Sequence, residues 1–330
     1  MKNIVVVGSL NLDLVAYVSR MPAEGETLTG NDFATFPGGK GANQAVAAAR
    51  LGARVSMVGR LGNDGFAAQL RQALNDAAVD TSRVAPVSKP TGTAVILVNE
   101  RGSNSIVVIP GANAALVPQD LDRHMDLLRN AAAILAQLEI PMETVVRLGE
   151  IAAEFGVPFI LDPAPARDLP PELLRNVTWL TPNETETRII LDGLGYPSGD
   201  PLNGAYPLDA AADRLLATGV RNVILKLGSR GIYLRGADVE SEIMPPFQVH
   251  AVDTTAAGDA FNGGFAYGIT QGMPPAEAAR VACAVAAVSV TRAGAQPSMP
   301  TIGEVNELMR SAVQEAYSEQ FAGSTELQRD

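Results

Sequence analysis

Short runs of β-branched residues alternate along most of this chain with Ala- and Leu-rich stretches whose apolar residues recur at helical spacing. Such alternation is typical of a parallel sheet whose strands are joined by crossover helices. The runs before Asp162 and Leu227 are apolar throughout, as in strands that are covered on both faces. We therefore predict an α/β protein with a mainly parallel central sheet flanked by helices. Expected strands cover 4–8, 55–60, 133–137, 158–161, 178–180 and 223–227, and expected helices cover 42–51, 66–77, 142–155 and 208–217.

Two stretches, 14–36 and 91–109, break this rhythm because they hold alternating, β-prone segments without helices between them. We predict that they form one small sheet that stands off the main domain, where it would cover a ligand site or pair with another subunit. The main domain would then comprise 1–13, 37–90 and 110–318. Residues 192–208, rich in Gly and Pro, are expected to form an irregular loop, and 319–330 a frayed tail.

Composition excludes several classes of function. The 25 Lys and Arg against 36 Asp and Glu leave a net charge of −11, and no basic cluster occurs, so nucleic acid and anionic membranes are not expected partners. Two His and one Cys make zinc or Cys/His nucleophile chemistry unexpected. The single cysteine fits a reducing compartment, and no apolar run approaches the ~20 residues of a membrane span, so a cytoplasmic protein is expected.

The segment 253–265 is the first candidate for chemistry. An acidic and hydroxyl-bearing stretch leads into three small residues, Ala256, Ala257 and Gly258, where a helix is expected to begin. Free backbone N–H groups there would suit a phosphate. Asp259, in the first turn, is expected to keep a pKa near the ordinary ~3.9 and to accept a hydroxyl proton. The alternative is an ordinary helix start with a first-turn Asp.

The segment 37–45 is rich in glycine, which lets a ligand approach the backbone, and Asn43 offers a donor and an acceptor for sugar hydroxyls. It is not a Walker A loop, because Gly41 follows Lys40 where Ser or Thr is required. It also lacks the third glycine of a dinucleotide-binding motif. A merely structural turn is the alternative.

Polar residues also follow two predicted strands. Asn11 and Asp13 lie two apart, so both can project to one side of an extended chain at the ligand-binding edge of the sheet. Asn183 and Glu186 have helical spacing and could organise a hydrated Mg²⁺, or could instead form an Asn cap with an acidic first turn. The loop 227–231 suits a tight hairpin or a nucleotide contact, and 292–298 offers oxygen ligands for a hard cation.

Together these motifs resemble the ribokinase-like (PfkB) carbohydrate kinases over nearly the whole chain. The most specific segments are 38–45, 110–114, 162–166, 181–184, 253–259 and 294–298, in family order. The resemblance implies a β-sheet lid that closes on the sugar and often forms the dimer contact. It further implies ATP-dependent phosphorylation of the 5-hydroxyl of D-ribose, with Asp259 as the general base and Ala256, Ala257 and Gly258 as the anion hole.

The same resemblance implies roles for further residues. Sugar hydroxyls would be held by Asn11, Asp13, Gly39, Lys40, Asn43 and Glu139. ATP would contact Asn183, Lys226, Gly228, Ser229, Arg230, Gly231 and Gly258, with Cys283 also on the nucleotide side and Glu186 organising Mg²⁺. A monovalent cation, K⁺, would be held by loop positions Asp253, Thr255, Ser289, Arg292, Gly294 and Ser298.

Two alternatives remain. Another kinase of the family would act on deoxyribose, fructose or a nucleoside, although none of the six sugar-side residues is aromatic, which argues against a nucleobase. The second alternative is a non-catalytic sugar-binding protein on this fold. The retained Asp259 beside small residues argues against this alternative. The acidic charge fits a kinase, because phosphoryl transfer depends mostly on positioning and local electrostatics rather than on a basic surface.

Overall fold

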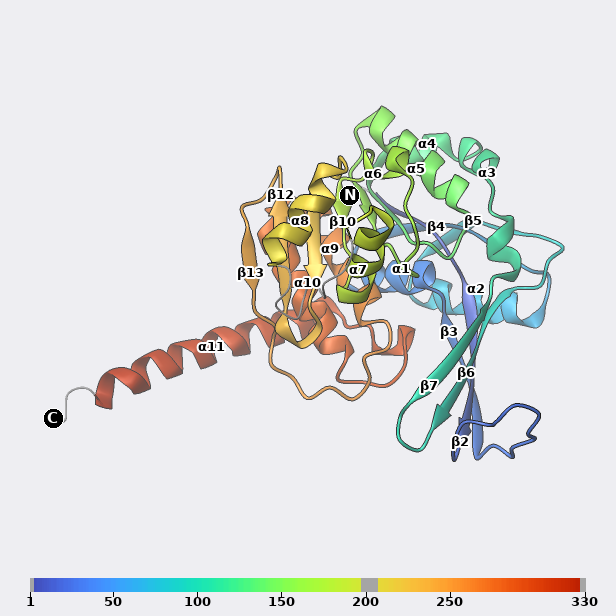
Figure 1. Cartoon of the computed structure of the whole chain (residues 1–330), viewed down its shortest axis with the longest axis horizontal. Coiled ribbons are helices and arrows are strands. Elements are labelled where there is room, and N and C mark those ends of the chain that lie inside the picture. The colour runs from blue at the N-terminus through green and yellow to red at the C-terminus, as the bar shows by residue number, and fades with distance from the viewer. Residues whose placement is uncertain (1–2, 197–206, 327–330) are drawn as a thin grey trace.

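The computed structural model describes residues 3–196 and 207–326, with 315–326 described by their backbone alone. The described chain forms a nine-stranded sheet in the order β13-β12-β11-β10-β9-β8-β1-β4-β5 and a separate four-stranded sheet (Figure 1). The large sheet consists of β1 (Asn3–Val7), β4 (Arg54–Leu61), β5 (Asp80–Pro86), β8 (Ala131–Ala136), β9 (Phe159–Leu161), β10 (Trp179–Leu180), β11 (Asn222–Lys226), β12 (Ile232–Gly236) and β13 (Glu242–Met244).

All pairings from β5 across to β11 are parallel, and only β12 and β13 add antiparallel pairings at one edge. This confirms the predicted mainly parallel α/β fold. The six expected strands all exist, and β12 follows the loop that was expected to form a tight hairpin, but β5 and β13 were missed. β5 is a partly exposed edge strand with several polar residues, and β13 has only three residues, so neither carries a clear strand pattern.

Helices cover both faces of the large sheet because successive strand residues point to opposite sides. In β1, Ile4 and Val6 pack in one core and Val5 and Val7 in the other. The first core lies under α1 (Lys40–Arg50), α2 (Gly65–Asp76), α9 (Ala257–Thr270) and α10 (Pro275–Ser289). The second lies under α3 (Pro118–Asp122), α4 (Met125–Arg129), α5 (Met142–Phe155), α6 (Pro171–Leu174), α7 (Glu184–Gly193) and α8 (Leu208–Ala217).

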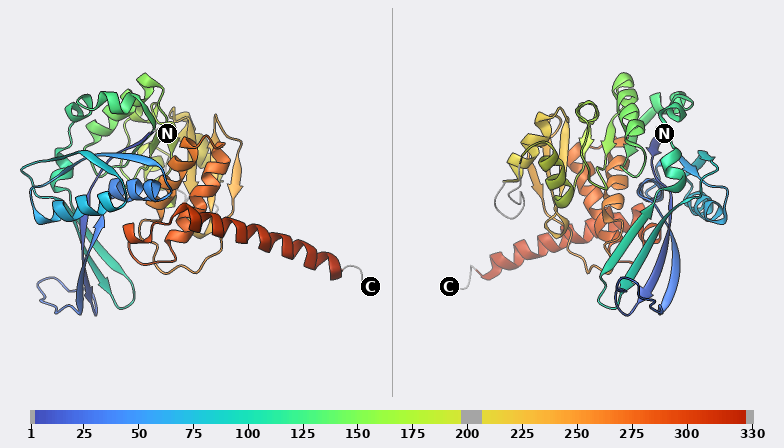
Figure 2. Two further views of the ribbon diagram at one scale, coloured as in Figure 1. Left: turned by 180° about the vertical axis from the view of Figure 1, so that it is seen from behind. Right: turned by 45° about the vertical axis from the view of Figure 1, so that its right-hand side comes forward.

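The small sheet projects from the main body in every ribbon view (Figures 1 and 2). Its strands run in the order β3-β2-β6-β7, with β2 (Asn11–Val18) parallel to β6 (Gly92–Asn99) and antiparallel to β3 (Asp32–Gly38). β7 (Asn104–Ile109) pairs antiparallel with β6 at the open edge. Because β2 begins at Asn11, that residue and Asp13 lie on the small sheet itself rather than just before it.

Two predicted segments fall partly outside the described residues. Of the expected loop 192–208, residues 197–206 lie outside them, and α8 begins at Leu208. The helix α11 (Ile302–Glu326) continues into the segment 319–330 and extends away from the body (Figure 2), so the predicted fraying of that segment stays a prediction. Among the described helices, none has the length and hydrophobicity needed to cross a bilayer.

Candidate active site

A cavity of about 780 Å³ lies where the small sheet meets the carboxyl ends of the main strands. Open parallel sheets bind ligands at this edge, because the loops that leave the strands converge there. Predicted site residues that line the cavity are Asn11, Asp13, Gly39, Lys40, Asn43, Glu139, Asn183, Glu186, Lys226, Gly228, Ser229, Gly231, Thr255, Ala256, Ala257, Gly258, Asp259 and Cys283. Arg230, Asp253, Ser289, Arg292, Gly294 and Ser298 lie outside its lining.

Glu139 joins three segments at the small-sheet end of the cavity. Its Oε2 accepts hydrogen bonds from Ser9 Oγ at 2.5 Å, from the Lys40 backbone N–H at 3.2 Å and from Asn11 Nδ2 at 3.3 Å. Asn113 fixes the other end of the Asn11 side chain by donating to its Oδ1 at 2.8 Å. The residues after β1, the start of α1 and the start of β2 are therefore held together around one carboxylate.

Asp13 projects into the same part of the cavity. Burial, together with the nearby negative charges of Glu139 and Asp259, raises the pKa of its carboxyl to about 7. Near neutral pH the group is therefore present in both protonation states, so it can donate to or accept from a ligand hydroxyl. A Cβ on Gly38 would collide with the Asp13 carboxylate, so the glycine there makes room for this side chain.

Asp259 is buried at the start of α9 and is held through both of its oxygens. Asn43 Nδ2 donates to Oδ2 at 2.9 Å, and Gln44 Nε2 donates to Oδ1 at 3.1 Å. The expectation of an ordinary pKa was wrong, because burial raises the pKa of Asp259 to about 6, with Lys40 opposing the rise and Asp162 adding to it. The carboxylate still exists mainly in the ionised form at pH 7, so it can accept a proton.

Close helix packing brings these amides to Asp259. A Cβ on Gly263 in α9 would lie 2.6 Å from Ala47 Cβ and 2.8 Å from Gln44 O, so only glycine allows α9 to approach α1 this closely. At its other side, α9 is fixed by the Thr181 hydroxyl, which donates to Asn262 Oδ1 at 2.8 Å. The small residues of the 253–265 motif therefore serve packing as well as access by a ligand.

The start of α9 presents free backbone donors to the cavity. The N-cap residue Ala256 has a φ of 59°, a conformation that L-residues seldom adopt and that is often retained at functional sites. Ala257 N–H donates to Thr254 O, whereas the amides of Gly258 and Asp259 have no acceptor among the described residues. An anion placed here would meet free N–H groups and the positive end of the helix dipole.

Asn183 and Glu186 form the capping arrangement that the sequence left as an alternative. Asn183 Oδ1 accepts from the Glu186 N–H at 2.8 Å, and Glu186 Oε2 accepts from the Asn183 N–H at 2.7 Å. Both residues nevertheless line the cavity. Burial raises the pKa of Glu186, while the positive charge of Lys226 opposes that rise.

The far end of the cavity is lined by the 3₁₀ turn η2 (Gly228–Arg230) and by α10. Gly228 and Ser229 face the cavity, whereas Arg230 does not line it and its guanidinium pairs with the lining residue Glu184. Cys283 lies in the α10 wall, and burial raises the pKa of its thiol to about 12. The thiol is therefore un-ionised and contributes an apolar surface to this end of the cavity.

Asp253 connects the two loops that were predicted to hold a cation. Its Oδ1 accepts from Thr255 N–H and Oγ1, at 2.9 and 2.6 Å, and its Oδ2 accepts from Gly294 N–H at 2.9 Å. Although burial opposes ionisation, these hydrogen bonds lower the pKa of Asp253 below its usual value. The Arg292 side chain pairs instead with Glu304. The Ser289 and Ser298 hydroxyls donate to backbone carbonyls.

Sequence reasoning missed part of the site. Gln44, which contacts Asp259, and Asp162, which lines the cavity, were quoted within motifs but were given no role, and Gln137 was placed only at the end of an expected strand. A polar pair in an Ala- and Val-rich helix, and an Asp directly after an apolar strand, are signals that could have identified the first two. The small sheet also contributes apolar lining that the sequence did not place, namely Ala94, Ile96, Ile106 and Val108.

Comparison with known proteins identifies the class that this fold and site define. The family model described as pfkB family carbohydrate kinase matches residues 1–302. The chain therefore belongs to the PfkB family of carbohydrate kinases, and it is a phosphotransferase that acts on a sugar hydroxyl.

Individual relatives refine this result. Ribokinase of Bacillus subtilis (strain 168) is 40% identical over 310 residues, which cover 94% of this chain and 100% of that protein. Deoxyribokinase of Salmonella typhi is 40% identical over 309 residues, which cover 93% of this chain and 98% of that protein. The structure of Arabidopsis thaliana ribokinase complexed with ribose and ATP matches with a TM-score of 0.86 and 35% identity. The match covers 93% of this chain and 98% of that chain.

Proposed function

We propose that this chain is an ATP-dependent ribokinase that phosphorylates the 5-hydroxyl of D-ribose. The observation that carries the proposal is the buried carboxylate of Asp259, held by Asn43 and Gln44 beside the free amide of Gly258. A base next to an anion-binding helix start is the arrangement that transfer of a phosphoryl group to an alcohol requires. Two relatives support the proposal: the Bacillus subtilis ribokinase, and the Arabidopsis thaliana ribokinase whose structure is complexed with ribose and ATP.

The sugar would bind between the small sheet and α1. Asn43 lies there with a buried Oδ1 that has no hydrogen-bond partner among the described residues, so it can accept from a ligand hydroxyl. Asn11, Asp13 and Glu139 add further acceptors, and the backbone at Gly39 and Lys40 lies beside them. A compact, polyhydroxylated ring would satisfy these closely spaced polar groups.

ATP would occupy the opposite end, near η2 and α10, with its terminal phosphate toward Gly258. Among the described residues, no cluster of three His, Cys, Asp or Glu residues could hold a metal ion by itself. This fits Mg²⁺, which proteins usually hold with one or two carboxylates together with substrate phosphates. Glu186 is the carboxylate at this position, and Mg²⁺ would neutralise charge on the phosphates.

During transfer, Asp259 would accept the proton of the sugar hydroxyl as that oxygen attacks the terminal phosphorus, while the bond from this phosphorus to the bridging oxygen breaks and ADP leaves. The free amides of Gly258 and Asp259 would donate to the phosphoryl oxygens, where negative charge is concentrated, whereas the Ala257 amide is already bonded to Thr254 O. The apolar residues Ile106 and Val108 of the small sheet line the cavity, so closure of this sheet would exclude water and suppress hydrolysis of ATP.

The proposed substrate can be tested by following ADP release with MgATP and K⁺ over ribose, deoxyribose, fructose and adenosine. We expect the highest kcat/KM with ribose. A clear preference for deoxyribose would contradict the proposal and make the chain a deoxyribokinase, the second candidate, which the equally identical Salmonella typhi relative favours. A preference for fructose or adenosine would assign it to another member of the family.

We also propose that K⁺ binds beside the loops joined by Asp253. The ionised carboxylate and the carbonyl-rich loop 292–298 fit a large monovalent cation, because such ions prefer oxygen ligands. Replacing K⁺ by tetramethylammonium at constant ionic strength should lower kcat at least about tenfold, the scale of one lost electrostatic contact near the developing charge. An unchanged kcat would contradict this site.

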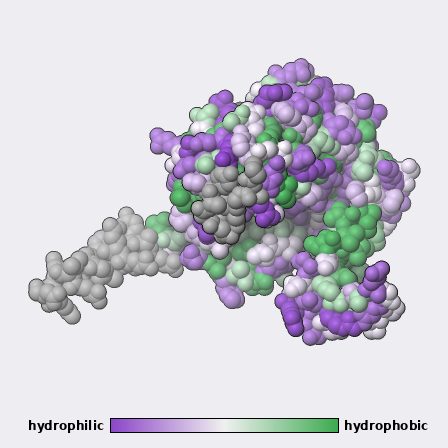
Figure 3. All heavy atoms as spheres, in the orientation of Figure 1, coloured by the Kyte–Doolittle hydropathy of each residue, from purple (hydrophilic) through white to green (hydrophobic). Residues whose placement is uncertain are grey.

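A homodimer formed through the small sheet is also proposed. Ile106, Val107, Val108 and Ile109 of β7 are all exposed at its open edge, where Figure 3 shows an apolar patch. Exposed apolar patches of this kind often mark protein interfaces. Val107→Glu should therefore shift the protein from dimer to monomer in sedimentation velocity. Ile243→Glu is the matched control, because Ile243 is equally exposed, at 62%, on the edge strand β13.

A further inference from the structure

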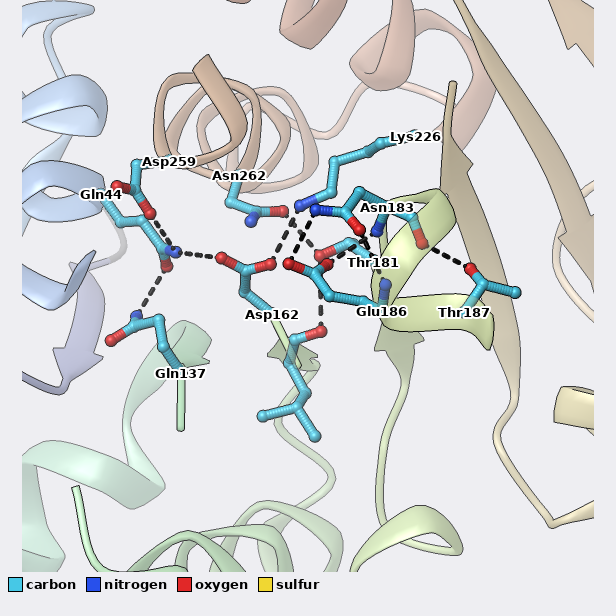
Figure 4. A network of polar contacts seen from close by, with 11 residues as sticks. Gln44, Gln137, Asp162, Thr181, Asn183, Glu186, Thr187, Lys226, Asp259 and Asn262 are labelled. Atoms are coloured by element: carbon cyan, nitrogen blue, oxygen red, sulfur yellow. Dashed lines mark hydrogen bonds and ion pairs between the residues drawn. The ribbon is translucent and has the colours of Figure 1, made fainter. Parts of the chain in front are cut away.

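A buried ion pair in the cavity wall joins Lys226, an expected ATP contact, to Asp162, which has no role in the function described so far. Lys226 Nζ lies 2.9 Å from Asp162 Oδ1, and the two side chains are only 12% and 3% exposed (Figure 4). Removing both charges from water costs free energy that their attraction often fails to recover, so such a pair is weak evidence for a purely stabilising role. Its place in the cavity wall suggests a role in binding or catalysis.

Lys226 ends β11 and extends toward the start of α9. A Cβ on Gly258 would lie 3.3 Å from its Nζ, so the ammonium group sits beside the amides that face the cavity. An ammonium has three donors, and within the described residues Asp162 is the one acceptor that the Lys226 ammonium reaches. Further donors of Lys226 are therefore available to a ligand at the start of α9.

Asp162 is in turn connected to Asp259. Gln44 Nε2 donates to Asp162 Oδ2 at 3.0 Å and also to Asp259 Oδ1 at 3.1 Å (Figure 4). Gln44 Oε1 accepts from Gln137 Nε2 at 2.7 Å, which sets the orientation of the Gln44 amide. One amide nitrogen therefore bridges the two carboxylates, and the chain of contacts runs from Lys226 to Asp259 without a gap.

We propose that Asp162 and Gln44 are positioning residues that hold the Lys226 ammonium against the transferring phosphoryl group and in register with Asp259. This inference rests on the proposed transfer of a phosphoryl group from ATP to a sugar. Lys226 supplies a positive charge to a cavity wall that is otherwise rich in carboxylates, and it is the residue of the three that touches the phosphate. Asp162 orients the Lys226 ammonium, and Gln44 fixes the position of Asp162 relative to the proposed base, Asp259.

The pH dependence of kcat/KM tests this arrangement. The charged and titratable groups facing Asp259 are Lys40 from the start of α1, Asp13 from β2 and Asp162 after β9, with Lys226 behind Asp162. Asp162→Asn removes a negative charge near Asp259 and so lowers the pKa of Asp259. The acid limb of the profile, where kcat/KM falls as the pH drops, should therefore move to lower pH by about one unit. Lys226→Met leaves Asp162 unneutralised, so the limb should move to higher pH. The double variant should return toward the wild-type profile.

Nucleotide binding provides a measurement that does not depend on which sugar is phosphorylated. Lys226→Met should weaken binding of a non-hydrolysable ATP analogue roughly 10- to 100-fold, the value of a charge-assisted hydrogen bond, and should weaken ADP binding much less. Lys226→Arg keeps the charge and should restore most of the affinity for the analogue. If the wild-type protein fails to phosphorylate ribose, the proposed substrate is wrong, whereas this calorimetric comparison still tests Lys226.

Asp120→Asn is the matched control, because Asp120 pairs with Arg60 in another buried ion pair that lies outside the cavity lining. It should lower the melting temperature and leave the pH profile and analogue affinity unchanged. Acid limbs that move in the same direction in the two single variants, or that do not move, would overturn the proposal. Equal loss of affinity for ADP and for the ATP analogue in Lys226→Met would also overturn it.

Discussion

Asp259→Asn is expected to lower kcat by at least roughly 10²- to 10⁴-fold, the contribution of a positioned general base. The amide keeps the shape of the side chain and a hydrogen-bonding oxygen, but it cannot take the hydroxyl proton. In the wild-type enzyme, kcat/KM should fall as the pH drops through about 6, because burial raises the pKa of Asp259 to that value and the protonated form is inactive. Steady-state kinetics over pH 5 to 9 would measure both effects.

Loss of folding is not expected to account for this result, because replacing Asp259 by Asn should not destabilise the fold at alkaline pH. The pKa of Asp259 is higher in the folded state than in the unfolded chain, so the ionised carboxylate lowers the stability of the fold above about pH 6. Asp259→Asn should therefore melt no lower than wild type at pH 8, and calorimetry should show ribose binding that is little changed. Turnover near the wild-type rate in this variant would exclude Asp259 as the base.

Gly41→Ala is expected to have the largest effect on stability. A Cβ at Gly41 would lie 2.7 Å from both Gly8 C and Ser9 N, and these backbone atoms belong to the buried residues that directly follow β1. Separating α1 from this strand should cost at least about 2 kcal/mol of unfolding free energy, seen as a fall of about 4 °C or more in Tm. Because α1 carries Asn43 and Gln44, kcat should also fall, by roughly 100-fold.

Gly65→Ala provides the control for that variant. Gly65 begins α2, and an added Cβ there meets no atom within 4 Å. Alanine favours helix by up to about 1 kcal/mol over glycine, so the control should be neutral or slightly more stable. Equal stability of the two variants would show that α1 can shift away from β1 at little cost, contrary to the close packing at Gly41.

Local patterns in the sequence determined the class of fold. Apolar runs such as 158–161 predicted buried strands, and the interruptions at 14–36 and 91–109 predicted a separate small sheet, because side-chain periodicity reports which faces a strand buries. The motif at 253–259 likewise predicted a helix start with exposed amides. Period and capping depend on near neighbours in the chain, so they can be identified without knowledge of the tertiary structure.

Only the tertiary structure decided the electrostatics of the site. The pKa of Asp259 depends on burial beneath α1 and on charges at Lys40 and Asp162, which lie more than 90 residues away along the chain. The bridge formed by Gln44 likewise needs Gly263 to bring α9 against α1. Burial and charge act through space, so a sequence can show which groups are present but not which of them meet. The residue types were thus evident from the sequence, whereas the chemical state of the proposed base arose from packing.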